Sequence, residues 1–192
     1  MRKTNVWALA PLMALALAAC GDNEGSATAK SGAAPAVAPS TKTLDAEIRD
    51  NADLDTLDGV IKAAGLSEVL ASKGPYTVFA PSNASLSQLS GSLTGDAQKA
   101  QSAALLRAHI VPGALTRADI LAAIERGGDD GIQMRTMADT LLTFSRDGDK
   151  ILVTAPNGAV AGLTGSETPA ANGVLQPTDG VLVKPSEDRP KL

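Results

Sequence analysis

Two separated blocks of the sequence, residues 74–83 and 105–113, constrain the fold more than any other feature. We call them the first and second motif block. The first reads GPYTVFAPSN, and its β-prone middle predicts an apolar strand that ends at Pro81. Ser82 or Asn83 can then cap a helix, because their side-chain oxygens accept hydrogen bonds from a helix start. The first motif block therefore predicts a strand that leads directly into a helix.

The second motif block predicts the end of a helix followed by a short strand. It reads LLRAHIVPG, so helix-forming residues give way to a β-branched run that Pro112 and Gly113 close. In the first block, Val78 and Phe79 lie in the most apolar part. We expect both to lie in the core on a central strand.

The hydrophobic spacing of the first half of the chain is helical. Gly65 can end one helix, Asp53 or Asp55 can cap its start, and Thr116 with Asp119 resembles a capping box for another. The first of these helices has an apolar stripe at i, i+3, i+4 and i+7, formed by Leu57, Val60, Ile61 and Ala64.

The spacing of the second half is strand-like. Short β-prone runs are separated by turn sequences at residues 146–149 and 156–158. An Asn-Gly pair precedes a last strand pair, which we expect at residues 174–175 and 181–183. A helical first half and a β-rich second half predict an α+β fold, not alternating α/β.

In this order and at this separation, the motif blocks resemble the signature blocks of the fasciclin domain family. The resemblance covers roughly residues 43–185 and implies a twisted β-wedge with helices packed at one side. Near the C-terminus the usual His-x-Ile-Asp becomes Gln176-Pro177-Thr178-Asp179, and residues 125–131 look like an altered loop. The family is extracytoplasmic and is associated with adhesion and binding, so the resemblance implies a non-catalytic protein.

The resemblance also supplies candidate interaction residues, because adhesion in the family is linked to segments around these blocks. For Asn83 the alternative is a helix cap, and for His109 it is a structural role in which the ring bonds backbone beneath a neighbouring strand. We favour the structural role in both cases. The full candidate set is Thr77, Phe79, Pro81, Ser82, Asn83, His109, Pro112 and Gly113.

The N-terminus predicts a signal peptide over residues 1–19. Arg2 and Lys3 precede an apolar stretch at residues 6–19, which is shorter than the roughly 20 residues of a membrane span. The stretch ends in LAAC, which looks like a bacterial lipobox, so Cys20 is predicted to carry lipid such as palmitate. The alternative is an ordinary signal peptide with an incidental cysteine.

The predicted domain order continues with a lipidated cysteine and flexible linker at 20–43, a fasciclin-like domain at 44–185 and a polar tail at 186–192. The linker is rich in Ala, Gly, Ser, Pro and Thr, and about 22 such residues reach roughly 25 Å. Gly21, not Asp22, follows the cysteine, which favours the outer membrane over the inner membrane.

The composition argues against several kinds of chemistry. The sequence has one His and one Cys, which cannot form the usual zinc site, and it contains no Gly-x-Ser-x-Gly elbow. The acids at residues 50–58 lack the glycine and the closing glutamate of a calcium loop. The net charge of −4, which becomes about −6 without Arg2 and Lys3, and only four aromatic residues argue against nucleic-acid binding.

These observations predict a non-catalytic envelope lipoprotein that displays an adhesion or interaction domain, with no cofactor and no metal. Its expected partners are membrane lipid through acylated Cys20 and a protein or polysaccharide on the cell surface or in the envelope. The alternative is a carrier that binds a small apolar ligand or a polysaccharide in a cleft, which would require a ligand-sized cavity. A hydrolase, the third class, would require clustered titratable groups in a pocket.

Overall fold

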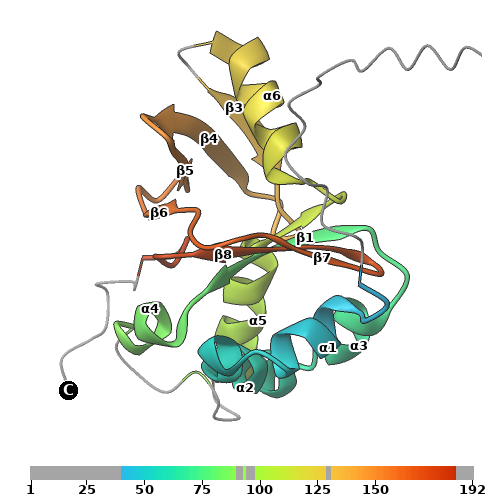
Figure 1. Ribbon diagram of the computed structural model, residues 1–192. Coiled ribbons are helices and arrows are strands. Elements are labelled where there is room, and N and C mark those ends of the chain that lie inside the picture. Colours follow the sequence, from blue (N-terminus) through green and yellow to red (C-terminus); the bar gives the residue numbers. More distant parts are fainter. Residues whose placement is uncertain (1–39, 90–92, 94–97, 129–130, 185–192) are drawn as a thin grey trace, which may run out of the picture. The chain divides into compact units, whose positions relative to one another are not determined.

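The computed structural model describes residues 40–89, 93, 98–128 and 131–184 (Figure 1). The chain divides into two units, Met1–Pro35 and Ala36–Leu192, and every described residue lies in the second. Cys20, the predicted signal peptide, most of the predicted linker and the predicted tail lie outside the described residues.

The described helices are mostly short. Gly65 ends α2 in the left-handed conformation (φ 70°), and Thr116 with Asp119 forms the capping box of α6, so both predictions are confirmed. The predicted cap at Asp53 or Asp55 is wrong, because Leu54 occupies that position without a side-chain bond. The elements are α1 (Leu44–Arg49), η1 (Ala52–Leu54), α2 (Asp55–Ala64), α3 (Ser67–Ala71), α4 (Asn83–Ser87), α5 (Lys99–Ala108) and α6 (Arg117–Gly127).

The first sheet contains both motif blocks. Its order is β2-β1-β8-β7, with β1 (Tyr76–Pro81), β2 (Ile110–Pro112), β7 (Thr168–Ala170) and β8 (Gly173–Thr178). β1 and β8 are parallel, whereas the outer pairs are antiparallel. Gly173 lies opposite Tyr76, where a Cβ would stand 1.9 Å from the Tyr76 carbonyl oxygen, so only glycine permits this approach.

The second sheet is an antiparallel meander in the order β3-β4-β5-β6. Its strands are β3 (Ile132–Arg135), β4 (Leu141–Asp147), β5 (Lys150–Thr154) and β6 (Val160–Gly162). The turns predicted at 146–149 and 156–158 connect them, and Gly148 and Gly158 supply the positive φ angles of 59° and 76° that such turns need.

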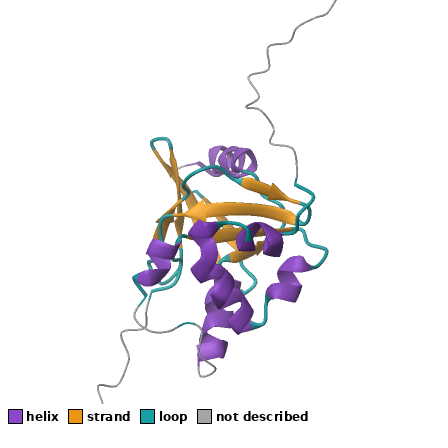
Figure 2. Cartoon of the chain, turned by 60° about the horizontal axis from the view of Figure 1, so that its bottom comes forward, coloured by secondary structure: helices purple, strands orange, loops and turns teal. Residues whose placement is uncertain are grey.

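β1 is buried on both faces and separates two apolar clusters. Val78 and Ala80 pack with the helices, while Phe79 faces the second sheet and lies 5.3 Å from Phe144 between ring centroids. Figure 1 shows this first sheet between α1–α5 and the second sheet, and Figure 2 shows most helices gathered against one side of the strands. The α+β prediction and the central core position of Val78 and Phe79 are confirmed.

Three expectations about the chain differ from the structure. Residues 181–183 form no strand, because the Leu182 N–H is bonded to the His109 ring instead of a neighbouring strand. The expected loop at 125–131 begins later, since α6 continues to Gly127. Ser40 and Lys42 fall in the predicted linker, yet their backbones bond Pro169 and Ala171 beside β7.

Candidate functional site

Thr77 of the first motif block ties its strand to the end of the second block. Its side chain is fully buried and donates to the Gly113 carbonyl at 2.6 Å, while its oxygen accepts from the Leu115 N–H at 2.9 Å. Gly113 in turn donates to the Pro75 carbonyl at 2.9 Å. The polar atoms of Thr77 and the backbone of Gly113 are therefore used to join β1 to the turn after β2.

Ser82 and Asn83 have separate capping roles. Ser82 caps α4 by accepting from the Ser85 N–H at 3.3 Å. The Asn83 side chain instead reaches the start of α2, where it accepts from the Thr56 N–H at 2.9 Å and donates to the Ala52 carbonyl at 2.8 Å. Asn83 thus caps the start of α2, a role that the sequence pattern assigns to Asp53 or Asp55.

His109 uses both ring nitrogens inside the domain. Its side chain is 1% exposed, and Nδ1 lies 2.8 Å from the Leu105 carbonyl oxygen, while Nε2 accepts from the Leu182 N–H at 2.9 Å. Because a carbonyl only accepts and an N–H only donates, the proton sits on Nδ1. Burial lowers the pKa of His109 to about 4, so the ring is neutral at pH 7. The expectation of a buried ring bonded to backbone is confirmed.

The other candidate residues divide between core and surface. Phe79 is fully buried, and Pro81 is buried at the end of β1. Pro112 is exposed at the end of β2. Both motif blocks are thus brought together, since the Phe79 N–H donates to the His109 carbonyl at 2.9 Å, but most of their side chains point inward.

Two further polar residues fasten the last strand of the first sheet. Asn172 accepts from the Leu44 N–H at 2.8 Å and donates to the carbonyls of Leu70 and Ser72 at 2.7 and 2.6 Å. Asp179 accepts from the Gly162 N–H at 2.6 Å. Both residues belong to the family pattern, but the sequence predicts neither of these contacts.

A polar network surrounds the buried side chain of Gln176, which stands where the family pattern has His. Its amide donates to Glu167 at 2.8 Å and to the Leu115 carbonyl at 3.1 Å, and its oxygen accepts from Arg117 Nε at 3.2 Å. The Arg117 N–H also donates to Glu167 at 2.6 Å. Because these groups satisfy one another, the network has a scaffolding role at the start of α6.

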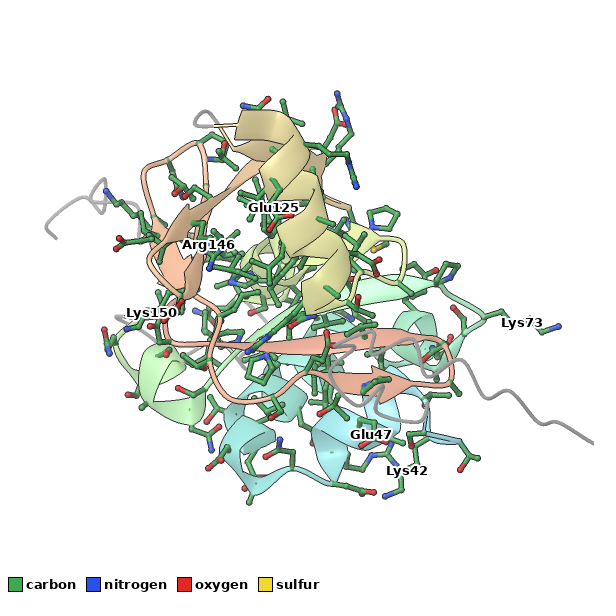
Figure 3. All side chains as sticks on the ribbon, turned by 45° about the horizontal axis from the view of Figure 1, so that its top comes forward. Lys42, Glu47, Lys73, Glu125, Arg146 and Lys150 are labelled. Carbon is green, nitrogen blue, oxygen red and sulfur yellow. The ribbon has the colours of Figure 1, made fainter. Side chains whose placement is uncertain are left out.

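The charged side chains are spread over several elements. Figure 3 shows Lys42 and Glu47 near α1, with Lys73 and Lys150 on different parts of the chain. Among the described residues, no three His, Cys, Asp or Glu side chains are placed to hold a metal ion. None of the described helices has the length and hydropathy that a membrane span requires.

An apolar cleft of about 470 Å³ lies beside α5. We call it the α5 cleft. One wall is a single face of α5, because the lining residues of this helix recur at helical spacing. They are Gln101, Ala104, Leu105 and Ala108. Leu89 and Leu93 extend the apolar lining. The sequence contained a signal for this wall, because small residues recur on one face of a helix that otherwise packs on the core.

The opposite wall of the α5 cleft comes from the C-terminal part of the domain. It includes residues 182–184 and the turn at residues 155–157, and Ala138 and Thr140 complete the described lining. His109 connects the two walls, because it caps α5 through Leu105 and holds Leu182 in place. Lys184 is an exposed lining residue, and we call its position the rim. Its Nζ lies beside the backbone of Gly158, 3.2 Å from the point where a Cβ on that glycine would stand. None of the predicted site residues lines the cleft.

Comparisons with known proteins agree with the fold and the motif blocks. Protein sll1483 of Synechocystis sp. is 29% identical over 154 residues, which is 78% of each chain. Stabilin-1 of Mus musculus is 31% identical over 159 residues, which is 79% of this chain but 6% of that protein. The FAS1 domain pair from the insect cell adhesion molecule Fasciclin I superposes with a TM-score of 0.63 and 12% identity, over 76% of this chain and 52% of that one.

The family assignment covers most of the described domain. A model of the Fasciclin domain matches residues 52–184, a span that contains both motif blocks, Asn172 and Asp179. The structural likeness to Fasciclin I shows the same fold at low sequence identity. The chain therefore belongs to the fasciclin domain family.

Proposed function

We propose that the protein is a non-catalytic interaction module that is displayed on the cell envelope through lipid on Cys20. Fasciclin domains typically mediate adhesion or other interactions and are generally non-enzymatic. The observation that carries the proposal for this chain is the state of its single histidine. Both nitrogens of His109 are already bonded to backbone, so the ring would have to leave its place before it could move a proton for a substrate.

The relatives support an interaction role. Fasciclin I, the insect protein with the same fold, is a cell adhesion molecule. In this chain most side chains of the motif blocks are used inside the domain, so contacts with a protein or polysaccharide partner would come from exposed loops such as the turn at residues 146–149. Loops of this kind vary between relatives without disturbing the scaffold.

The lipid anchor rests on the position of Cys20 after an apolar stretch, and the outer membrane is the favoured location. Several acyl chains would anchor the protein stably, because each buried methylene contributes about 0.8 kcal/mol. The test is Cys20→Ala, followed by membrane fractionation and by mass measurement of the mature chain. The proposal predicts loss of lipid and release from the membrane fraction or a block in processing.

A substitution of Ala19 in the same segment by Ser, another small residue, is the control and should leave the protein in the membrane fraction. Unchanged mass and membrane association in Cys20→Ala would contradict the anchor. Crosslinking of the wild-type chain in intact cells, with mass spectrometry of the products, tests the interaction role separately. Recovery of the chain without a crosslinked partner at any exposed loop would contradict that role.

One observation favours the carrier alternative as a second function. A carrier requires a cavity of ligand size, and pockets for small molecules commonly span about 300–1,000 Å³. The α5 cleft, at about 470 Å³, falls within that range.

A further inference from the structure

We propose that the α5 cleft binds an amphiphile with a single alkyl chain and an anionic head group. This inference rests on the carrier alternative and is independent of the lipid anchor and of any protein partner. It assigns the alkyl chain to the apolar walls and the head group to the rim at Lys184.

The walls suit a flexible alkyl chain. Leu89, Leu93 and Leu105 contribute branched aliphatic side chains, and Leu182 with Val183 faces them from the C-terminal segment. The alanines at 104 and 108 leave the space that larger residues on the same helical face would fill. A chain buried here gains the usual hydrophobic free energy for each methylene removed from water.

The same walls are unsuited to a sugar or to a flat aromatic ligand. No Phe, Tyr or Trp is among the described residues that line the cleft, so nothing there offers a ring face for stacking. Polar groups are confined to a few positions such as Gln101, Thr140 and Asn157. A polysaccharide would need many more hydrogen-bonding partners than these.

The rim favours a negative head group. Lys184 is the charged residue among the described lining residues, and no acid of the described part of the chain lines the cleft beside it. Asn157 uses its side-chain oxygen to accept from the Ala159 N–H at 3.0 Å, so its amide nitrogen is the group that it can offer to a ligand as a donor. A carboxylate or phosphate oxygen matches an ammonium and an amide donor, whereas a cationic head group would be repelled.

The test measures binding to the full chain carrying Cys20→Ala, in detergent-free buffer at pH 8, by isothermal titration calorimetry. The probes are dodecanoate, dodecyl phosphate, dodecanol and dodecyltrimethylammonium. We expect the two anions to bind at one per chain and more tightly than dodecanol, and the cation to bind most weakly. A comparison of octanoate with dodecanoate should give up to about a fourfold gain in affinity per added methylene.

Two variants with matched controls locate the site. Ala104→Trp places a large side chain in the cleft from an exposed position and should weaken dodecanoate binding at least about tenfold. Ala118→Trp, at an exposed position of α6 outside the cleft, should leave dodecanoate binding unchanged. Lys184→Gln should weaken dodecanoate binding by about two- to fivefold and leave dodecanol binding unchanged. Lys150→Gln removes the same charge outside the cleft and should change neither.

The outcomes separate the alternatives. Preference for dodecanoate over dodecyl phosphate would indicate a fatty-acid-like ligand, and the reverse would indicate a phosphate lipid; either supports the proposal. Absence of binding by all probes, equal or tighter binding of the cation, or anion binding that survives Ala104→Trp would overturn it. Binding only after removal of residues 185–192 would also overturn it, by assigning the cleft to the chain's own tail. Membrane release of Cys20→Ala is scored independently, so failure of the cleft proposal and failure of the anchor proposal are distinguishable.

Discussion

The motif blocks and the α5 cleft differ in what their side chains do. In the motif blocks, Thr77, Asn83 and His109 direct their polar atoms to backbone groups of the same domain. In the cleft, Ala104 and Lys184 lie at the surface and line an open volume. The polar residues that identify the family therefore hold the fold together. The surface suited to a ligand is built mostly from residues outside the motif blocks, and only Leu105 and Ala108 of the second block contribute to its described lining.

The motif blocks and the cleft differ because their residues meet different structural requirements. Asn83 bonds a helix start 27 residues earlier, and His109 bonds a backbone N–H 73 residues later, so each fixes elements that are distant in sequence. A residue lining the cleft needs only a suitable size and polarity. Substitutions in the motif blocks should consequently change stability, and substitutions in the cleft should change binding.

The largest expected effect on stability is in the first motif block. Phe79→Ala removes a fully buried ring that packs on Phe144 and should lower the free energy of unfolding by about 3–5 kcal/mol. Val160→Ala on β6 is the control, because Val160 is 53% exposed and its loss should cost less than about 0.5 kcal/mol. Denaturant melts of both variants check this, and a loss below about 1 kcal/mol for Phe79→Ala would show that β1 is peripheral.

The next effect is a pH dependence that His109 imposes. Its folded pKa of about 4 lies below the unfolded value of about 6.5, so protonation favours the unfolded chain. The contribution of neutral His109 to the free energy of unfolding is therefore fully present above about pH 6.5. About 3 kcal/mol of it should be lost as the pH drops toward 4.

Melts between about pH 6.5 and 5 isolate this contribution, because most carboxylates titrate at lower pH. His109→Gln should be less stable than the wild type at pH 7 and should lose the slope in this window. A wild-type slope that persists in His109→Gln would assign the pH dependence to another group.

A smaller loss is expected at the start of β8. Asn172→Ala removes three hydrogen bonds that connect α1 and α3 to this strand and should cost about 1–3 kcal/mol. Asn157→Ala is the matched control, since Asn157 is exposed and makes one local bond to Ala159. Equal losses in the two variants would contradict a special role for Asn172.

The smallest effect on stability is expected in the cleft itself. Ala104 is exposed on α5, so Ala104→Trp should change the free energy of unfolding by no more than about 0.5 kcal/mol. A loss above about 2 kcal/mol in thermal or denaturant melts would show that the cleft is part of the packed core.

Local sequence patterns predicted β1, the end of α2 at Gly65 and the capping box of α6, because each depends on neighbouring residues. They missed α1, β3 and β7, which are short. The two strands are stabilised by pairing with β4 and β8, and the helix by packing against its neighbours. The bonds from Asn83 to the start of α2 were not predicted, and the strand predicted at 181–183 is wrong, for the same reason: distant partners decide both.

The α5 cleft as a whole could not be predicted from local sequence patterns. Leu89, Leu105 and Leu182 come from separate parts of the chain, and the packing of α5 against the C-terminal segment brings them together. The stripe of small residues on α5 gave only one wall. Leu182 on the other wall is placed by its bond to His109, which no local pattern encodes.

The most direct test of the separation between fold and site is the dodecanoate affinity of Asn83→Ala and Ala104→Trp, measured side by side in the Cys20→Ala chain. Asn83→Ala should lower stability by about 1 kcal/mol through loss of its bonds to Ala52 and Thr56, while its affinity stays within about twofold of the parent. Ala104→Trp should keep its stability and lose binding at least about tenfold. A folded Asn83→Ala variant that loses dodecanoate binding, together with an Ala104→Trp variant that retains it, would contradict the account.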